Sequence, residues 1–456
     1  MATIDLSRPQ RVHVVAIGGA AMNAMALILQ AMGHAVTGSD MADSPVVEQL
    51  RGHGIDVAIG HDAAHVNGAD IVAISTAIRP DNAEVVAARN AGIPVITRPE
   101  LQSAICALRR PVAVAGTHGK TTTTAMLALA LRDAGLDPSF IVGGVVTGLG
   151  TGARWADSEL LVVEADESDG TFLELGAHGV IVTNVEPDHL DHWGGFDALK
   201  AAFAQFVEAA PGPKVICADD PGAAAIADAV GGCTTYGTAA DADYHLGDGA
   251  VRCPDGERVA LTSPVPGLHN ARNATAAFAM ADLLGADRRA VAASLASFAG
   301  VARRWEVRGE VNGITFVDSY DHLPSEVRAV LSAAKEGGWA RVVCVFEPHR
   351  HTRTRDLHLA FGDAFDDADV LAVTDIYLPA GQQPIEGVTG KLVVDAVLTM
   401  HPWKRVAWLP TRRDVRAWLL AELRPGDLCL TLGAGDLTTL PDEVIAALES
   451  PAARRT

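Results

Sequence analysis

The segment Ala115–Thr124, which reads AGTHGKTTTT, carries residue types suited to binding nucleotide phosphates. A short apolar run, 112–115, leads into it, and a helical stretch that begins MLALAL follows it closely. In such a strand–turn–helix unit the backbone N–H groups and the helix N-terminus point at the phosphates. The Lys120 ammonium would reach the β and γ oxygens, and the Thr121 hydroxyl would hold Mg²⁺. The general pattern expects glycine where Val114 stands, so the strand–turn–helix context carries this prediction.

Acidic and polar residues follow each of the next two strand candidates, 160–163 and 179–183. The first group comprises Glu164, Asp166, Glu167 and Asp169, and the second comprises Asn184, Glu186, Asp188, His189, Asp191 and His192. Carboxylates this close repel one another unless a cation lies among them. Either group alone also fits a solvated surface, but two groups at strand ends beside the loop predict a divalent metal ion. The oxygen-rich composition favours Mg²⁺ or Mn²⁺ over the zinc that the two histidines would suggest.

The overall composition limits the partners of the chain. Its 456 residues include 36 Lys+Arg and 56 Asp+Glu, a formal charge of −20, so neither nucleic acid nor an anionic membrane is an expected partner. The chain has no apolar run of about 18 residues and no signal-peptide pattern at its N-terminus. We therefore expect a soluble, cytoplasmic monomer or homodimer that acts on small molecules. The cysteines are scattered and are expected to be reduced core thiols: Cys106, Cys217, Cys233, Cys253, Cys344 and Cys429.

Short β-branched strands alternate with Ala/Leu-rich helical stretches along the chain, which is the pattern of βαβ units. Strands are expected at 11–17, 34–38, 70–76, 93–97, 112–115, 160–163, 179–183, 214–217, 313–317, 341–346, 369–374, 404–409 and 427–432. A β-rich excursion is expected over 234–266, and an amphipathic helix over Glu326–Lys335. The chain then divides into three α/β domains, 1–109, 110–301 and 302–456. The last residues, 451–456, are expected to fray.

Further motifs, taken together with the phosphate loop, are highly specific. They read GTHGKTTTT (116–124), VEADESDGTFL (163–173), TNVEPDHLDHW (183–193), GLHNARNA (267–274), FAGVARRWE (298–306), VFEPHRHTRT (345–354), IEGVTGK (385–391) and GAGD (433–436). With these motifs the chain resembles the Mur ligases over nearly its whole length. The resemblance implies an N-terminal Rossmann-like domain for a UDP-sugar-type acid substrate, and a central P-loop ATPase-type domain with a mainly parallel sheet for ATP and Mg²⁺ or Mn²⁺. It also implies a C-terminal Rossmann-like domain for the amino acid.

The resemblance also implies roles for individual residues. Lys120, Glu164 and His189 would be catalytic, and Thr121, Glu164 and His189 would hold metal ions. The ATP contacts would be Gly116, Thr117, His118, Gly119, Lys120, Thr121, Thr122, Asn270, Arg304 and Asp318. The amino-acid site would comprise Tyr320, Asp321, His322, His349, Arg350 and Arg353. The acid substrate would be held by Gly18, Gly19, Ser39 and Asp40.

The implied chemistry is amide-bond formation through an acyl phosphate. A carboxylate is a poor electrophile, so the γ-phosphoryl group of ATP is first transferred to it, and an amine then attacks. Phosphoryl transfer needs positioning and charge neutralisation, which Lys120 and divalent cations supply. Closure of domains over the site would exclude water from the acyl phosphate. The guanidinium groups of Arg350 and Arg353 suit bidentate capture of the amino acid's carboxylate.

Two loops depart from the family pattern, and both concern substrates rather than ATP. In the N-terminal turn Ala16 and Ala21 replace glycines, which costs on the order of 1 kcal/mol wherever φ must be positive. A Cβ there also obstructs the approach of a diphosphate. In the stretch VDSYDHLPSE, 317–326, Ser319 replaces an Asp, Asp321 an Ala and Leu323 a His. Asp321 could repel the α-carboxylate of an amino acid or attract a second amine, and neutral drift is the plainer reading.

These observations leave several functions open. The chain could join UDP-N-acetylmuramate to L-alanine, as one branch of the family does, or it could be a Mur-type ligase recruited to another acid–amine pair in specialised metabolism. Altered substrate loops beside an intact ATP site argue for changed substrates more than for decay. A catalytically silent nucleotide-binding regulatory paralogue is a third reading. Retention of Lys120, Thr121, Glu164 and His189 speaks against it. An oxidoreductase is weaker still, because the N-terminal glycines are depleted.

Overall fold

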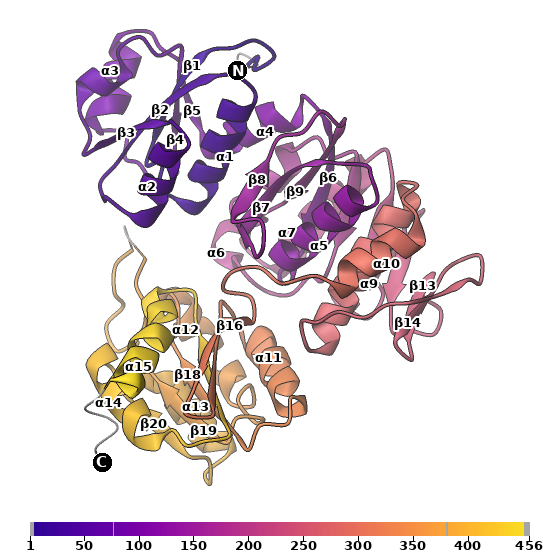
Figure 1. Ribbon diagram of the computed structural model, residues 1–456, viewed down its shortest axis with the longest axis vertical. Helices are drawn as coiled ribbons and strands as arrows, with labels where there is room; N and C mark the ends of the chain where they lie inside the picture. The colour runs from indigo at the N-terminus through magenta and orange to yellow at the C-terminus, as the bar shows by residue number, and fades with distance from the viewer. Residues whose placement is uncertain (1–3, 76, 380–381, 451–456) are drawn as a thin grey trace. The chain divides into compact units, whose positions relative to one another are not determined.

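The computed structural model describes residues 4–75, 77–379 and 382–450 and shows three parallel-rich sheets (Figure 1). The predicted fraying of residues 451–456 lies outside the described residues. Residue contacts divide the chain into two compact units, one of residues 1–264 and 271–299 and the other of residues 265–270 and 300–456. The first unit holds the first two sheets, and the second unit holds the third. Each unit is described by itself.

The N-terminal sheet is wholly parallel and has the strand order β3-β2-β1-β4-β5. Its strands are β1 (Arg11–Val15), β2 (Ala35–Asp40), β3 (Asp56–Ile59), β4 (Ile71–Ile74) and β5 (Val95–Thr97). Its helices are α1 (Ala20–Ala31), α2 (Pro45–Gly52), α3 (Ala83–Asn90) and α4 (Arg98–Cys106), with a 3₁₀ turn η1 (Ala63–Val66). The order reverses between β1 and β4, and ligands of open parallel sheets bind beyond the strand ends at such a point.

The central sheet has ten strands in the order β15-β14-β13-β12-β11-β10-β6-β9-β7-β8. Its strands are β6 (Arg110–Ala115), β7 (Ser139–Val146), β8 (Thr151–Arg154), β9 (Leu160–Glu164), β10 (Gly179–Val182), β11 (Lys214–Cys217), β12 (Thr234–Gly237), β13 (Tyr244–Gly247), β14 (Ala250–Arg252) and β15 (Arg258–Ala260). The helices are α5 (Lys120–Asp133), α6 (Leu190–Trp193), α7 (Phe196–Ala209), α8 (Pro221–Val230), α9 (Leu268–Leu283) and α10 (Arg288–Ala296). The middle strands are parallel, and antiparallel pairs close both edges. The β-rich excursion expected over 234–266 forms one of these edges.

The C-terminal sheet has the order β16-β17-β21-β18-β19-β20, with only β16 antiparallel to its neighbour. Its strands are β16 (Glu306–Val311), β17 (Ile314–Ser319), β18 (Arg341–Phe346), β19 (Val370–Val373), β20 (Val406–Trp408) and β21 (Asp427–Leu432). The helices are α11 (Pro324–Glu336), α12 (His351–Leu357), α13 (Lys391–Met400), α14 (Arg412–Glu422) and α15 (Leu440–Glu449), with 3₁₀ turns η3 (His358–Phe361) and η4 (Asp436–Thr439). Alternate residues of β18 enter two cores, with Cys344 in one and Val343 in the other. Helices therefore cover both faces of this sheet.

The α/β architecture with three domains agrees with the sequence prediction, and each expected strand is present with its ends moved by at most a few residues. Four strands were not expected: β3, β7, β8 and β16. Each lacks a clear alternation of apolar residues, because β7 and β8 contain glycines and β16 reads EVRGEV. Strands of this kind lie at or near sheet edges, where neighbours rather than propensity decide their conformation.

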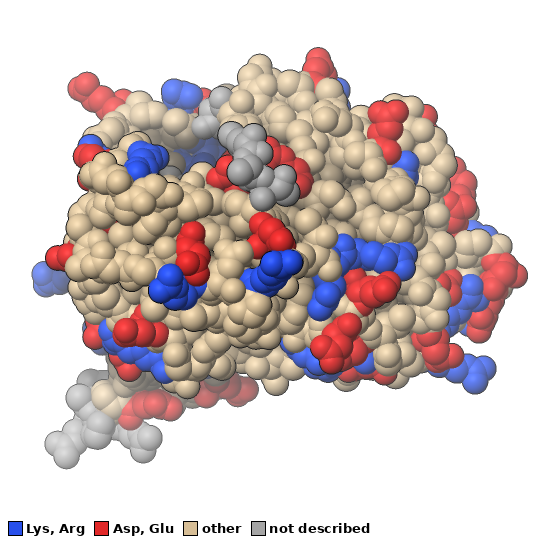
Figure 2. Space-filling model, turned by 90° about the horizontal axis from the view of Figure 1, so that it is seen from above, with Lys and Arg blue, Asp and Glu red and all other residues tan. Residues whose placement is uncertain are grey.

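Two properties bear on partners. In the part of the chain that the structure describes, no helix has both the length and the apolar character needed to cross a membrane. On the face drawn in Figure 2, acidic and basic side chains are interspersed over the surface.

All six cysteines are free thiols, and only Cys233 is not fully buried, which agrees with the expected core thiols.

Candidate active site

The nucleotide loop joins β6 to α5 and depends on two glycines in the left-handed region. Gly116 has a φ of 137° and Gly119 a φ of 78°. A Cβ on Gly116 would overlap Thr183 Oγ1, and a Cβ on Gly119 would lie 2.7 Å from Asn273 Oδ1. A side chain at either position would therefore meet both backbone strain and a steric clash. The loop requires glycine at both places.

Residues that follow β10 support this loop from the neighbouring strand. The Asn184 side chain accepts from His118 N at 2.8 Å and donates to His118 O at 3.1 Å. Thr117 Oγ1 accepts from Glu186 N at 2.9 Å. Asn184 and Glu186 belong to the second polar group, which was predicted to bind a metal ion. Their hydrogen bonds instead help to fix the conformation of the nucleotide loop. Thr122 is buried in the first turn of α5.

The Lys120 ammonium lies against the loop and faces oxygen atoms. Its Nζ donates to Gly116 O at 2.7 Å and to Glu167 Oε2 at 2.8 Å. Burial disfavours the charged form, but the nearby carboxylates of Glu167 and Asp166 outweigh it and raise the pKa of Lys120. Lys120 therefore stays protonated, which is the state that neutralises phosphate charge. Burial raises the pKa of Glu167 to about 7, against the opposing effect of Lys120.

Thr121 and Glu164 come together as the sequence predicted. Thr121 Oγ1 donates to Glu164 Oε1 at 3.1 Å, and the other carboxylate oxygen accepts from Gly143 N of β7 at 2.8 Å. A hydroxyl and a carboxylate at this spacing suit Mg²⁺, which usually takes one or two protein ligands plus phosphate and water. Within the described residues, no group of three or more His, Cys, Asp or Glu has metal-binding geometry. The donors fit a magnesium site that phosphate oxygens complete.

His189 precedes α6 and has a φ of 52°. Its Nε2 lies 3.2 Å from Asp188 Oδ2. Burial would raise the pKa of Asp166, but the charges of Lys120 and His189 hold that pKa below its ordinary value. His189 therefore lies within electrostatic reach of the acid group that also faces Lys120.

The predicted acid-substrate turn joins β1 to α1. Gly18 N donates to Asp40 Oδ2 at 2.9 Å, and Gly19 N donates to Ala16 O at 3.2 Å. Ala16 has a φ of 59°, so it occupies a conformation that favours glycine, whereas Ala21 lies inside α1. Of the two departures from the family pattern, only Ala16 therefore carries backbone strain. Ser39 is fully buried rather than open to a ligand.

The predicted acceptor site lies beyond the carboxyl end of β17. The Tyr320 ring has the guanidinium carbon of Arg303 4.9 Å from its centroid and that of Arg304 4.7 Å from it. Asp318 is buried and accepts from Thr431 Oγ1 at 2.7 Å and from Thr438 Oγ1 at 2.6 Å. The two residues predicted to reach ATP from this domain, Arg304 and Asp318, thus border the same loop.

The two charge-changing departures in this loop contact each other. The Ser319 hydroxyl donates to Asp321 Oδ2, and Ser319 Oγ in turn accepts from Trp305 N at 3.1 Å. The added carboxylate of Asp321 is therefore hydrogen-bonded within its own loop. His322 Nδ1 lies 3.0 Å from Tyr320 O, and its backbone N–H donates to Glu326 Oε2 at 2.8 Å. The replaced histidine position, Leu323, is buried at the start of α11.

His349 stacks on Tyr377 with ring centroids 5.7 Å apart and meets His322 edge to face at 5.8 Å. Burial and the charges of His322, Arg353 and Arg350 lower the pKa of His349 to about 3. Its Nδ1 lies 3.2 Å from Arg353 Nη1, which can only donate. The neutral ring therefore carries its proton on Nε2. In this arrangement His349 can donate a hydrogen bond to an oxygen but has no free lone pair with which to act as a base.

Arg350 precedes α12 with a φ of 71°, and its backbone N–H donates to Tyr377 O at 3.0 Å. Its backbone is therefore in a conformation that favours glycine. Glu347, the first residue after β18, is buried, and its Oε1 has no hydrogen-bond partner among the described residues. Burial and Asp436 raise the pKa of Glu347 to about 7. Glu347 thus belongs to the same strand-end motif as His349, Arg350 and Arg353, and it interacts with Asp436 and Arg303.

Asn270, predicted to contact adenine, lies in the first turn of α9. Its Nδ2 donates to Pro266 O at 2.7 Å. Asn270 belongs to the second compact unit, and Asn273, which contacts the nucleotide loop, belongs to the first. Sequence reasoning passed over Asn273, Arg303 and Glu347, although all three stand inside the quoted motifs.

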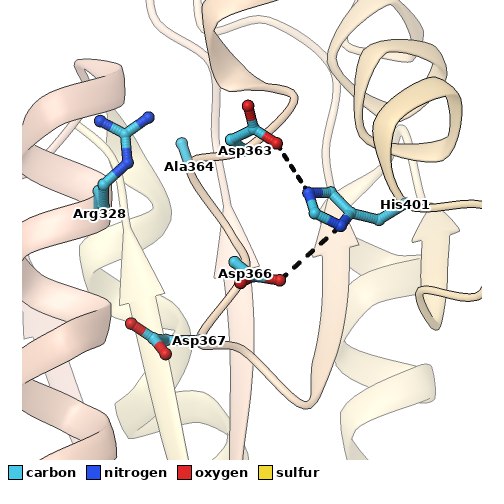
Figure 3. A pocket seen from close by; sticks show the side chains of 6 residues that line it. All are labelled: Arg328, Asp363, Ala364, Asp366, Asp367 and His401. Carbon is cyan, nitrogen blue, oxygen red and sulfur yellow. Dashed lines mark hydrogen bonds and ion pairs between the residues drawn. The ribbon is translucent and has the colours of Figure 1, made fainter.

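A separate hollow of 330 Å³ in the C-terminal domain contains none of the predicted residues (Figure 3). His401 lies between two carboxylates there, with Nε2 2.9 Å from Asp363 Oδ1 and Nδ1 3.8 Å from Asp366 Oδ1. Arg328 of α11 lines the hollow as well. Through the hydrogen bond between the imidazole and Asp363, this group joins the end of α13 to the loop before β19.

The fold and the nucleotide loop together define the class of protein. A P-loop at the centre of a parallel sheet, with a hydroxyl and a carboxylate at metal-ligand spacing, belongs to nucleotide-phosphate-binding enzymes. Family models match three segments: "Mur ligase family, catalytic domain" over residues 11–110, "Mur ligase middle domain" over 114–281, and "Mur ligase, glutamate ligase domain" over 303–435.

Individual relatives agree. The UDP-N-acetylmuramate–L-alanine ligase of Kineococcus radiotolerans is 46% identical over 465 residues, which cover 98% of each chain. That of Anaeromyxobacter dehalogenans is 44% identical and covers 97% of this chain and 99% of its own. The crystal structure of the UDP-N-acetylmuramate–alanine ligase of Thermotoga maritima superposes with a TM-score of 0.81 at 28% identity, covering 96% of this chain and 99% of that one. The chain belongs to the Mur ligase family, and it is an ATP-dependent, amide-forming ligase.

Proposed function

We propose that this chain joins UDP-N-acetylmuramate to L-alanine, with ATP converted to ADP and phosphate. The observation that carries the proposal is the 44% identity to a ligase of that name over 97% of this chain, both substrate-binding regions included. The N-terminal domain would hold the UDP-sugar, the central domain ATP, and the C-terminal domain the amino acid. Such substrates place the reaction in the cytoplasm.

In the first step a carboxylate oxygen of the acid attacks the γ-phosphorus, and the bond to the ADP oxygen breaks. Lys120 would neutralise charge on the transferring group, and its contacts with Gly116 O and Glu167 keep it beside the loop. Thr121, Glu164 and His189 would hold Mg²⁺ or Mn²⁺, which when bound neutralises phosphate charge. The two glycines let the loop backbone approach the phosphates closely.

In the second step the amine attacks the acyl carbon, loses a proton, and phosphate leaves. Arg350 and Arg353 would bind the amino acid's carboxylate as bidentate donors. His349, neutral and protonated on Nε2, would donate to a substrate oxygen rather than remove the proton from the amine. Tyr320, His322 and Asp321 would border the amine. Asn270, Arg304 and Asp318 would contact the nucleotide.

The test is release of ADP with UDP-N-acetylmuramate and a panel of single amino acids, with Lys120→Ala as the control for contaminating ATPases. L-Alanine should give the highest kcat/KM. Turnover that requires UDP-N-acetylmuramate but prefers another amino acid would contradict the proposed acceptor, and turnover with none of them would contradict the proposed acid as well.

The Ser319–Asp321 pair favours a second candidate, a ligase for an amine other than L-alanine, because a carboxylate beside the acceptor loop attracts cationic groups. Asp321→Ala separates the two. A shift in amino-acid preference with an unchanged KM for ATP would support the second candidate, and an unchanged preference for L-alanine would remove it. A large rise in the KM for ATP would contradict the placement of Asp321 at the acceptor.

A further inference from the structure

Glu84, near the start of α3, is the centre of a polar cluster inside the N-terminal domain. Its side chain is 0% exposed, and it is surrounded by three histidines and a serine. Charged side chains are almost never buried to this extent without a structural or functional reason. None of the roles proposed above uses this residue.

Each partner of Glu84 comes from a different element. Ser39 Oγ at the end of β2 donates to Glu84 Oε2 at 2.7 Å. His61 Nδ1, two residues after β3, lies 2.8 Å from the same oxygen, and His65 Nδ1 of η1 lies 2.7 Å from Oε1. His13 Nε2 of β1 lies 3.5 Å from Oε1. One carboxylate therefore joins four segments of the domain.

The carboxylate is in its ionised form. Burial would raise the pKa of Glu84, but the hydrogen bonds from Ser39 and His65 and the proximity of His13 outweigh it and lower this pKa to about 2. Its place in the first turn of α3, where N–H groups are exposed, also favours a negative charge. Since an ionised carboxylate only accepts, both imidazoles with Nδ1 against it donate from Nδ1.

The cluster lies beneath the turn that carries the predicted acid-substrate residues. Ser39 O accepts from Ile17 N at 3.0 Å, and the next residue, Asp40, accepts from Gly18 N at 2.9 Å. His61 and His65, whose side chains are 15% and 26% exposed, are the members that reach the surface, and both follow β3 on the ligand-binding edge of the sheet. Glu84 thus supports the glycine turn through Ser39 and orients the ring of His61.

We propose that Glu84 is a positioning residue for the acid-substrate site: it holds the ends of β2 and β3, through Ser39 and His61, in the arrangement that binds the nucleotide part of a UDP-sugar. The inference rests on the proposed function for the nature of that substrate. The Glu84 carboxylate is buried too deeply to contact the ligand itself, so its role is to position Ser39 and His61.

The test compares Glu84→Gln, which keeps the shape and removes the charge, with Val72→Ala, which destabilises the same domain by a cavity at a fully buried site of β4. Loss of hydrogen bonds to a charged acceptor predicts a rise of about tenfold in the KM for UDP-N-acetylmuramate. The kcat and the KM for ATP should stay within about twofold of the wild-type values, whereas a general structural defect would change them as well. Val72→Ala should lower the melting temperature but leave all three kinetic constants near those of the wild type.

Two further variants guard against a chain that fails to fold. Glu84→Asp keeps the charge but withdraws it by one methylene, and it should weaken UDP binding to a smaller extent. His61→Asn alters a partly exposed side chain and should weaken UDP binding in calorimetry even if both Glu84 variants unfold. Wild-type affinity for UDP in His61→Asn, or in the folded Glu84 variants, overturns the proposal.

Calorimetry with UDP alone also keeps the two hypotheses apart. A wild-type chain that binds UDP but does not turn over UDP-N-acetylmuramate contradicts the proposed function, while the comparison of UDP affinities still tests Glu84. A wild-type chain that turns over UDP-N-acetylmuramate, with equal KM values in the folded variants, contradicts the role of Glu84 alone.

Discussion

The nucleotide loop and the acid-substrate turn have the same local form, a parallel strand followed by a glycine turn and a helix, yet they tolerate side chains differently. At Gly116 a Cβ would overlap Thr183 Oγ1, and φ is also positive. In the N-terminal turn Ala16 occupies the left-handed region, and a Cβ on Gly19 would meet its first neighbour only at 3.4 Å. A turn position with space around it can accept alanine at a modest energetic cost, whereas a position packed against a neighbouring strand cannot.

The largest expected effect comes from removing the charge of Lys120 in the nucleotide loop. Lys120→Ala should lower kcat by about 10³-fold or more with any acid substrate, because no other cation of the loop reaches the transferring phosphoryl group. The melting temperature should change little. Steady-state ADP release with a circular dichroism control measures both. Retained turnover would mean that the loop is assigned wrongly.

The next effect compares matched glycine-to-alanine changes. Gly116→Ala should destabilise the chain by about 3 kcal/mol, because strain and overlap add. Gly19→Ala has room for its methyl group and an ordinary φ of −64°, and it should cost under about 1 kcal/mol. Denaturant unfolding of the two variants measures the difference. Equal losses would show that packing does not distinguish the two turns.

Acidification should affect the N-terminal domain through Glu84. A carboxyl whose pKa is lowered to about 2 in the folded chain contributes stability above its ordinary pKa of about 4.5, and this contribution is lost as the pH falls from about 5 to 2. Glu84→Gln should flatten this part of the stability curve. Melting temperatures measured across that range test the expectation, and identical slopes in both proteins would contradict it.

The smallest effect concerns the strained alanine. Ala16→Gly relieves the left-handed conformation and should stabilise the chain by about 0.5–1 kcal/mol, net of the greater freedom of glycine in the unfolded state. Removing the methyl group should also lower the KM for UDP-N-acetylmuramate without changing the KM for ATP. A variant that is less stable than the wild type would show that Ala16 makes favourable contacts that outweigh the strain.

Sequence reasoning reached the family and the α/β class, because these depend on short motifs at strand ends. It missed β16 and the hairpin of β7 and β8, whose residues show no apolar alternation. It also treated Ala16 and Ala21 alike, although only Ala16 has a positive φ. The predicted domain limits and the residue roles stay predictions.

By itself, the sequence determined which chemistry this protein can perform, because the order GTHGKT after a strand already specifies a loop that cradles phosphate. Only the tertiary structure decided how individual charges are used. Asp321 accepts a hydrogen bond from Ser319, His349 is a neutral donor because Arg353 occupies its Nδ1, and Glu84 collects partners from residues 13 to 65. The reason is that the state of a charge depends on its burial and on neighbours that are distant in sequence, which no local pattern records.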